Sequence, residues 1–578
     1  MAKKEKKETK TPESWAQEVK DKFQEVKDFR APRVEKQWMI NHAWYRGWHN
    51  LKYNTQTKRL VWDERDPLRF FINIIYAVVR AIRANVTKYQ PKWEVDGLPY
   101  GSLSVDEGRA LGYFLESQYE ELGIKKAVKN VVMYGLLYGH GIFQYGYDED
   151  LDDGEGNVWV DTPDPFDVYF DHLAGDVDNC RFVIKATRKP LSEIQKNPKY
   201  HGTEEIKTDS KLSASEYKSY LMQQDFGSDD TVQSKDSVLL YEGWFMEDDG
   251  FVRVVTVPEN GDVPIRNEKT DMTRLPFILY FADINPGEIY SEGWVKNLVP
   301  LNRALNYVER NNLENIVLFA KGKYITDKGS NVKMVTNENG QIIRVSRGSR
   351  FDQMDMKPMP QSVFTFVQNL MRYIEDVGAV HEAFMGRTPA GIKAGVAIEQ
   401  LISSNMNNLA DLVDNLEMSL GQLGEELLRL GFLKFDTSKS FKVRKPGGEE
   451  MVYKVIGNGD VELEDAIKIP ERASVKVNVV SGIAHTKEAR KEILLQLRAG
   501  GDIDRRTLLE ALDVPDVDEV EARLVEERSG IPISEDATDE MERKMMEAES
   551  QQASPEAPVA PPMGGPMPPE MNGMPPGV

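Results

Sequence analysis

Gly-Arg-Thr-Pro-Ala-Gly-Ile-Lys-Ala-Gly, residues 386–395, separates the two longest helical patterns of the sequence. In residues 363–384 before it and 398–430 after it, apolar side chains recur every three or four positions, which predicts one apolar stripe on each helix. At a rise of about 1.5 Å per residue, residues 396–430 form a rod of roughly 50 Å. A helix of this length is typical of a coiled coil, a helical repeat or a spine in an oligomer.

The glycine-rich loop has the spacing of a phosphate-binding loop but lacks its chemistry. Gly386 and Gly391 have the right interval. Ile392, Lys393 and Ala394 then follow, so no lysine stands directly after the second glycine and no hydroxyl is present for magnesium. The loop also joins two predicted helices, whereas a phosphate loop joins a strand to a helix. The sequence therefore disfavours nucleotide hydrolysis.

The rest of the sequence contains no motif that we would assign to catalysis, a metal or a cofactor. The scattered histidines and Cys180 show no metal-ligand spacing. Residues 148–161 superficially resemble a calcium loop, but Asp153 and Trp159 occupy the positions that require Gly and Glu. We interpret this stretch as an acidic hairpin turn, with a loose cation site as the alternative. We expect no enzymatic activity and no cofactor; an enzyme or motor is the competing class.

Length and charge limit the possible functions. The chain has 578 residues, 40% of them hydrophobic and 29% charged, and its net charge is −21. It can bury several cores, and two to four domains are expected. Such an acidic protein is a poor candidate for tight general binding of duplex DNA. An acidic surface suits a passage through which DNA slides without sticking, or it only keeps a large protein soluble.

The cysteine content and the apolar segments bear on the compartment. Cys180 is the single cysteine, so an internal disulfide framework is excluded, and we expect it to be a small apolar filler in a protein that folds in a reducing cytoplasm. No window approaches 18 uninterrupted apolar residues, and the N-terminus lacks the apolar core of a signal peptide. We therefore expect no contact with a membrane.

The first half of the chain is predicted to be helices followed by strands. Thr11 and Pro12 form a good helix start, an N-cap hydroxyl followed by proline at the first position. The predicted helices cover residues 12–29, 34–48, 70–89 and 106–137. The predicted strands cover residues 142–147, 165–170, 181–187, and an antiparallel pair at 241–245 and 251–257. The polar stretch 198–235 between them is predicted to be rich in loops.

The second half returns to helical periodicity around a small basic insertion. A helix is predicted over residues 294–320, and residues 321–360 form a β-type insertion with eight basic and four acidic residues. Strands are expected at 441–444, 451–456 and 475–480. A helical tract is expected over 486–528, and a disordered Pro/Met/Gly tail follows from residue 554.

As a whole, the pattern resembles the bacteriophage portal proteins, the ring-forming head-to-tail connectors of tailed double-stranded DNA phages. The resemblance covers roughly residues 30–530 and rests on the order of helix, β insertion, helix, glycine loop and long helix. The supporting motifs are Trp44-Tyr-Arg-Gly-Trp, Asn73-Ile-Ile-Tyr-Ala-Val-Val-Arg leading to Gln90-Pro-Lys-Trp, Tyr138-Gly-His-Gly-Ile-Phe, Pro165-Phe-Asp-Val-Tyr-Phe-Asp and Glu382-Ala-Phe-Met-Gly.

The resemblance implies an α+β, mainly helical fold of the portal type. It implies an N-terminal arm (1–30), a wing (31–293, 396–432 as its long helix, and 433–482), two stem helices (294–320 and 361–385), a clip (321–360), a tunnel loop (386–395), crown-like helices (483–548) and a tail (549–578). The short crown and the Pro/Met-rich tail depart from the family, so long internal barrels are not expected.

The resemblance also implies a place and partners. The protein would be made in the host cytoplasm and lie in the virion, at the portal vertex of the capsid. There it would form a homo-oligomer, a dodecamer, through which double-stranded DNA passes without sequence-specific binding. The implied protein partners are the large terminase, neck, head-completion or tail adaptor proteins, and the major capsid and scaffolding proteins.

Two groups of residues carry the site hypotheses. In the tunnel loop, Arg387 and Lys393 are expected to touch DNA phosphates transiently, with a role as merely solvated charges as the alternative. The tunnel-loop residues are Gly386, Arg387, Gly391, Lys393 and Gly395. The clip residues expected to dock partners are Lys333, Arg344, Arg347 and Arg350. The alternative function is another virion adaptor, of the tail or neck, without a DNA bore.

Overall fold

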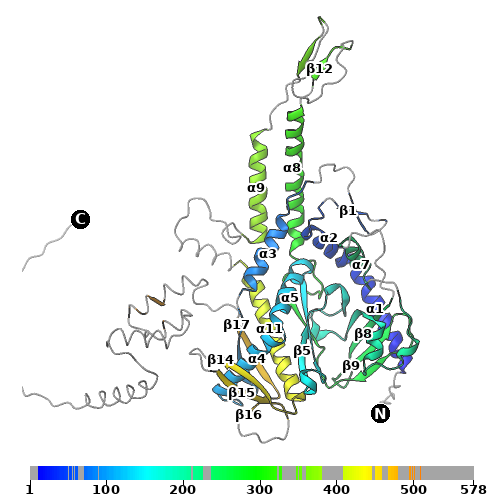
Figure 1. Ribbon diagram of the computed structural model, residues 1–578, viewed down its shortest axis with the longest axis vertical. Helices are drawn as coiled ribbons and strands as arrows, with labels where there is room; N and C mark the ends of the chain where they lie inside the picture. The colour runs from blue at the N-terminus through cyan, green and yellow to red at the C-terminus, as the bar shows by residue number, and fades with distance from the viewer. Residues whose placement is uncertain are drawn as a thin grey trace, which may run out of the picture. The chain divides into compact units, whose positions relative to one another are not determined.

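The structure is a computed structural model of the chain. It describes residues 11–49, 51–54, 56, 59–62, 70–88, 90–209, 213–225, 236–321, 324–328, 347–348, 350–353, 360–380, 408–444, 450–458, 466–478, 494–495, 498, 500 and 508. The chain divides into two compact units, Met1–Arg490 and Lys491–Val578. All helices and strands given below belong to the first unit (Figure 1).

The first two predicted helices are joined. Helix α1 (Pro12–Arg30) begins as predicted at Thr11, whose hydroxyl accepts from the backbone N–H of Ser14 at 3.3 Å. A π-helical turn, η1 (Ala31–Glu35), connects it directly to α2 (Lys36–Tyr45). The prediction of separate helices was therefore wrong, because the chain continues through Pro32 with only a local widening of the helix.

The next three helices are shorter than predicted. Helix α3 spans Ile74–Val86, within the predicted 70–89. The single helix predicted over 106–137 is instead two helices, α4 (Val105–Glu121) and α5 (Ile124–Tyr138). They are separated at Gly123, whose φ of +65° is left-handed and ends the helical path. Ser104 and Glu107 form a capping box that starts α4.

Two antiparallel sheets follow. The first has the order β11-β4-β5, with β4 (His140–Asp148), β5 (Asn157–Asp161) and β11 (Phe277–Phe281). The acidic stretch is the β4–β5 turn, as predicted. The second has the order β10-β9-β8-β7-β6, with β6 (Val168–Phe170), β7 (Phe182–Pro190), β8 (Ser237–Met246), β9 (Val252–Pro258) and β10 (Arg266–Lys269). The predicted antiparallel pair is β8–β9.

Some predictions in this region were too coarse. The predicted strand 165–170 begins as a 3-10 turn, η3 (Pro165–Asp167), before β6. The stretch predicted as loop contains α7 (Glu216–Asp225). The remaining short elements are β1 (Leu51–Asn54), β2 (Arg59–Trp62), α6 (Leu191–Lys196) and the 3-10 turns η2 (Asp152–Gly154), η4 (Val177–Asn179) and η5 (Thr203–Glu205).

Two long helices follow the sheets and lie side by side (Figure 1). Helix α8 (Val295–Lys321) matches the prediction, and α9 (Gln361–Gly378) ends earlier than the predicted residue 385. It ends there because Ala379 adopts a left-handed φ of +52°. Between them, β12 (Tyr324–Thr326) and β13 (Phe351–Gln353) pair antiparallel. The turn predicted at residues 337–340 lies outside the described residues.

The last long helix, α11 (Ala410–Lys434), is shorter than the predicted 396–430 rod. It is preceded by Leu409, whose φ of −108° and ψ of 10° are not helical, so the rod is not continuous through this position. Three strands follow where strands were predicted, β14 (Lys439–Arg444), β15 (Glu450–Ile456) and β17 (Ala473–Asn478), and a short strand that was not predicted, β16 (Ala466–Lys468), lies between β15 and β17 in the sequence. The tunnel loop, most of the tract 486–528 and the tail lie outside the described residues.

The N-terminal and C-terminal parts of the first unit meet in one small sheet. Strand β17 pairs antiparallel with β3 (Lys92–Gly97). Helix α4 contacts this sheet through two glycines, and α11 also packs against it. A Cβ atom on Gly108 or Gly112 would lie 2.5 Å from the carbonyl oxygen of Val95 or Trp93, respectively, so only glycine allows this approach.

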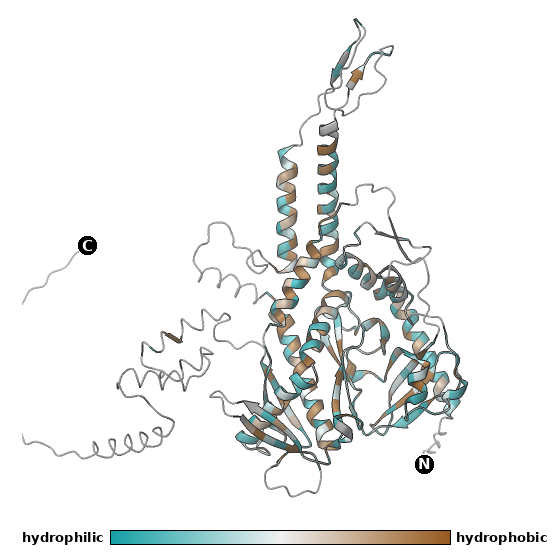
Figure 2. Ribbon diagram, in the orientation of Figure 1, coloured by the Kyte–Doolittle hydropathy of each residue, from teal (hydrophilic) through white to brown (hydrophobic). Residues whose placement is uncertain are grey.

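One large apolar core extends through this unit, from α1 to β17. Figure 2 shows apolar and polar positions alternating along the helices, and in α11 the leucines from Leu412 to Leu430 are buried. Within the described ranges, no helix has both the length and the apolar composition needed to cross a bilayer.

Candidate functional site

The helical pair α8–α9 and the insertion between them form the candidate functional site. We call the described part of this insertion, residues 324–328 and 347–353 without 349, the strand tip. Helix α9 faces α8 with a stripe in which Leu370, Ile374 and Gly378 are buried. At the end of the stripe, a Cβ atom on Gly378 would lie 3.2 Å from Val78 Cγ1 and 3.6 Å from Leu298 Cδ2. The last turn of α9 therefore fits against both α3 and α8.

Large apolar side chains on α9 are exposed on both sides of this stripe. At about 100° per residue, Phe364 and Met371 lie on one flank, and Phe366, Tyr373 and Val377 lie on the other. Their exposed fractions range from 42% to 51%. Soluble monomers rarely expose such contiguous apolar surface, which typically marks a protein interface. Each flank of α9 therefore has the composition of a protein–protein interface.

The third face of α9, opposite α8, is polar, and half-buried Glu375 at its edge is the one charged residue besides an Arg–Asp pair. It contains Arg372 and Asp376, whose side chains lie 3.9 Å apart one helical turn from each other. The other residues of this face are Gln361, Ser362, Thr365, Gln368 and Asn369. A surface of amides and hydroxyls offers neither strong attraction nor strong repulsion to a polyanion.

Helix α8 is held to α2 and α3 by buried amides. Asn302 Nδ2 donates to the carbonyl oxygen of Ile72 at 2.9 Å, and Asn306 Oδ1 accepts from the backbone N–H of Ile72 at 2.8 Å. The Asn306 amide also lies 2.7 Å from the His49 ring. Burial lowers the pKa of His49 to about 4, so the ring is neutral in the folded protein. The junction fixes the start of α3 on α8.

The strand tip contains two of the four predicted docking residues. Arg347 is exposed. Arg350 is exposed but engaged: its backbone N–H donates to Asp327 at 2.6 Å and its Nε donates to Asp352 at 2.5 Å. The hydrogen bond to Asp352 raises the pKa of the Arg350 guanidinium. These exposed contacts order the tip and contribute little stability.

The remaining predicted site residues cannot be placed. Lys333 and Arg344 of the insertion lie outside the described residues. The tunnel-loop residues Gly386, Arg387, Gly391, Lys393 and Gly395 also lie outside them. The structure thus neither brings these side chains together nor separates them.

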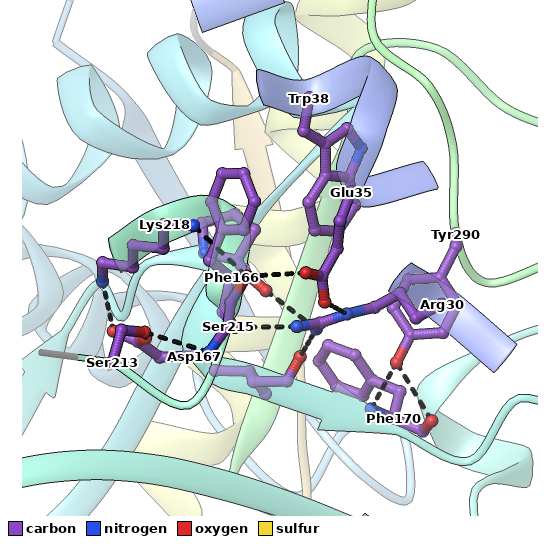
Figure 3. A network of polar contacts seen from close by, with 12 residues as sticks. Arg30, Glu35, Trp38, Phe166, Asp167, Phe170, Ser213, Ser215, Lys218 and Tyr290 are labelled. Atoms are coloured by element: carbon purple, nitrogen blue, oxygen red, sulfur yellow. Dashed lines mark hydrogen bonds and ion pairs between the residues drawn. The ribbon is translucent and has the colours of Figure 1, made fainter. Parts of the chain in front are cut away.

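A buried ionic network at Arg30, which the sequence did not indicate, fixes the N-terminal helices on the β6 sheet (Figure 3). Arg30 Nε donates to Glu35 at 2.7 Å, and its other nitrogens donate to the carbonyl oxygens of Pro165, Phe166 and Val168. Burial by itself lowers the pKa of Arg30, but Glu35 and neighbouring tyrosines raise it above its usual value. Every polar group of this guanidinium therefore has a partner, and its role is structural.

The network continues into α7, within the stretch predicted as loop. Ser215 Oγ donates to Glu35 Oε2 at 2.6 Å. Lys218 contacts both Asp167 and Asp164, the latter at 3.0 Å. Burial by itself lowers the pKa of Lys218, but the two carboxylates raise it by more. The pKa is therefore above its usual value, and the ammonium stays charged. No periodic signal in the sequence marks these residues, because they are scattered over three segments that meet only in the fold.

The described residues offer no arrangement that we would assign to catalysis or metal binding. Within them, no group of three or more His, Cys, Asp or Glu side chains is placed to hold a metal ion. Lys439 lies 3.4 Å from Asp152 and 3.2 Å from Glu155, so a lysine pairs with two carboxylates of the acidic β4–β5 turn. Cys180 is buried as predicted, and burial raises its thiol pKa to about 12.

Comparison with known proteins gives a family match over the part of the chain that contains the candidate site. The family model described as "Phage P22-like portal protein" matches residues 259–561, slightly more than half of the sequence. The matched range includes α8, the strand tip, α9 and α11. No curated protein matches the chain.

Proposed function

Because the chain belongs to the phage P22-like portal protein family, we propose that this bacteriophage portal protein forms a closed ring, a dodecamer, at one vertex of the capsid. The ring would provide the channel for packaging and ejection of double-stranded DNA. It would also be the docking site for the terminase, for neck or tail proteins, and for capsid and scaffolding proteins. We propose a structural role without catalysis.

The observation that supports the ring most directly is the pair of exposed apolar flanks on α9. Phe364 and Met371 face one side, and Phe366, Tyr373 and Val377 face the other. A subunit with two different apolar flanks can join neighbours head to tail, and such a heterologous contact closes into a ring when the rotation permits. The flanks would then be covered on both sides in every subunit.

In this arrangement, α8 and α9 are the stem and the polar face of α9 points to the channel. Its amides and hydroxyls, with the Arg372–Asp376 pair, would let DNA slide past without sticking. Residues 386–395 would form the tunnel loop, where the glycines permit changes of backbone angle as DNA moves. Arg387 and Lys393 would contact phosphates briefly. Normal packaging and retention of DNA by a variant with both residues replaced by Ala would refute this contact.

Residues 321–360 would be the clip, which docks partner proteins through Lys333, Arg344, Arg347 and Arg350. The local excess of four positive charges supports this role, since the protein as a whole is acidic. Arg350 would also order the tip, since its backbone N–H donates to Asp327 and its Nε donates to Asp352, while its exposed guanidinium can still meet a partner.

Deletion of residues 331–350 tests the proposed docking function. The variant should still form rings, because the α8–α9 stripe lies outside the deletion, but it should lose binding to the terminase in a pull-down. Substitution of Lys125 by Gln on α5 is the control, since it removes a positive charge elsewhere. Unchanged terminase binding by the deletion variant would contradict the clip assignment. A chain that binds neck proteins but forms no ring would favour an adaptor without a bore.

A further inference from the structure

The segment around α3 has an unusual charge pattern for an acidic chain. No acidic residue occurs between Asp66 and Glu94. The basic residues of this interval are Arg69, Arg80, Arg83, Lys88 and Lys92. Since the net charge of the chain is −21, a positive interval of this length needs a physical reason.

Two arginines of α3 lie beside tyrosines on the outer side of the helix. Tyr76 is 42% exposed, Arg80 is exposed and Arg83 is half-buried, and their spacing of four and three residues places them on one helix face. The Arg80 guanidinium lies over the Tyr76 ring at 5.3 Å. The Tyr76 ring in turn contacts the Tyr45 ring, with centroids 5.3 Å apart.

Tyr45 and its neighbour Arg46 extend this group from the end of α2. The pKa of Tyr45 is raised by burial, and Arg83, Arg80 and Arg46 oppose this rise, so all three cations act on the same phenol. We call Tyr45, Arg46, Tyr76, Arg80 and Arg83 the tyrosine–arginine surface. Within the described residues, neither Arg80 nor Arg83 forms an ion pair with a carboxylate.

The surface is held in place by side-chain hydrogen bonds to the backbone beside it. Asn73 caps α3 by accepting from the Tyr76 N–H at 3.0 Å, and its Nδ2 donates to the Tyr45 carbonyl at 3.0 Å. Asn302 of α8 binds the carbonyl of Ile72 just before the cap. The two tyrosines are therefore fixed relative to each other and to α8, and little conformational entropy is lost when a ligand binds.

The position of α3 relates this surface to the proposed channel. Val78, on the buried side of α3, lies against Gly378 in the last turn of α9. The described part of α9 and its cap ends at Val380, and the proposed tunnel loop begins at residue 386. The helix that carries the two arginines thus supports the end of the stem helix from which the loop departs.

We propose that the tyrosine–arginine surface binds the phosphates of double-stranded DNA close to the channel constriction. A guanidinium that stacks on a tyrosine ring keeps its N–H edge free, and that edge matches phosphate oxygens in a bidentate manner. Among the residues that the structure describes, no carboxylate pairs with Arg80 or Arg83, which favours an external anion. The inference rests on the proposed function, because it requires that DNA reaches this part of the ring.

The test measures binding of a short labelled duplex to assembled rings of the full-length chain, by fluorescence anisotropy between about 50 and 200 mM salt. The variant R80Q/R83Q should bind more weakly, and its slope of log affinity against log salt should fall by about 2, one for each lost phosphate contact. R80K/R83K should keep most of the slope because it keeps both charges. The control is R33Q/R109Q, which removes an exposed arginine stacked on Phe29 and an exposed arginine of α4.

A second measurement does not depend on any variant. In wild-type rings, duplex DNA should slow the modification of Arg80 and Arg83 by phenylglyoxal, measured by mass spectrometry, but not that of Arg33. Equal salt slopes for R80Q/R83Q and the control, or unprotected Arg80 and Arg83, would overturn the proposal. A third outcome would assign the surface to a subunit contact instead. In that case R80Q/R83Q would fail to assemble rings, and DNA would not protect Arg80 and Arg83 in wild-type rings. If the wild-type protein forms no rings, the proposed function is refuted. If DNA nevertheless protects Arg80 and Arg83 in that unassembled protein, DNA binding by this surface is still supported.

Discussion

Arg30 donates a hydrogen bond from Nε to Glu35 at 2.7 Å, and the two side chains are 0% and 2% exposed. The pair joins the end of α1 to the π-turn that follows it, and Arg30 also binds three carbonyl groups of the 165–168 segment. The ionic pair thus determines how the N-terminal helices lie on the sheet. A buried charge without its partner is costly, so this contact is where a single substitution should weaken the unit most.

Replacing Arg30 by Ala should lower the free energy of unfolding by about 3–5 kcal/mol, because Glu35 is left buried and unpaired. Denaturation in guanidinium chloride, followed by tryptophan fluorescence, measures the change. Arg33→Ala is the control, since Arg33 is exposed and should change stability by less than about 1 kcal/mol. The double variant R30L/E35L should be less destabilised than R30A. Equal stability of R30A and R33A would contradict the structural role.

The close contact of α4 with the small sheet leads to a second prediction. Gly112→Ala should destabilise the protein by about 1–3 kcal/mol, although alanine is the better helix former, because the new Cβ meets the Trp93 carbonyl oxygen at 2.5 Å. Gly175→Ala is the control, since its nearest neighbour lies at an ordinary 3.8 Å. Thermal unfolding measures both variants. A rise in the melting temperature of Gly112→Ala would mean that α4 does not approach β3 this closely.

The buried His140 should make stability depend on pH. Burial and the nearby Arg30 lower the pKa of this histidine to about 3, and within the described residues neither ring nitrogen has a hydrogen-bond partner. The unfolded chain takes up a proton near pH 6.5, whereas the folded chain does not. Stability should therefore fall as pH decreases from about 6.5 towards 3, by about 2 kcal/mol at pH 5 from this group alone.

Urea denaturation at pH 7.5 and pH 5 measures this dependence. His140→Leu should reduce the loss of stability between the two values, because it removes the group that protonates only in the unfolded chain. His201→Leu is the control, since His201 is exposed. An unchanged difference between the two pH values in His140→Leu would show that other groups cause it.

The sequence predicted regular elements well and special backbone positions poorly. Periodic apolar residues identified α8, and turn residues identified the β8–β9 pair. The division of α4 from α5 depends on Gly123, and the early end of α9 depends on Ala379, because the left-handed φ at each position breaks the helical path. The pattern of apolar residues continues through both positions, so it could not reveal either break.

The candidate site was predictable only in part, for a related reason. The order of elements indicated the helical pair and the family. Single-residue chemistry did not follow: the sequence did not indicate that the Arg350 guanidinium donates to Asp352 within the tip, and the docking role of Arg350 stays a prediction. Likewise, Lys218 pairs with Asp167 and Ser215 donates to Glu35 across long sequence distances, and only the fold brings these groups into contact.

The flanks of α9 provide a direct test of assembly. Tyr373→Glu places a charge on one exposed apolar flank, where a neighbouring subunit would have to bury it, and should shift the protein from rings to smaller species. Gln368→Glu adds the same charge to the polar face and should leave assembly unchanged. Mass photometry at matched concentrations compares the two variants. Intact rings with Tyr373→Glu would show that this flank is not an interface.

The most direct test of the central claim is negative-stain electron microscopy of the purified full-length protein. A portal protein of this family is expected to show closed rings, twelvefold in projection, each with a central hole wide enough for duplex DNA. Monomers under all conditions of salt, pH and concentration would contradict the proposed ring.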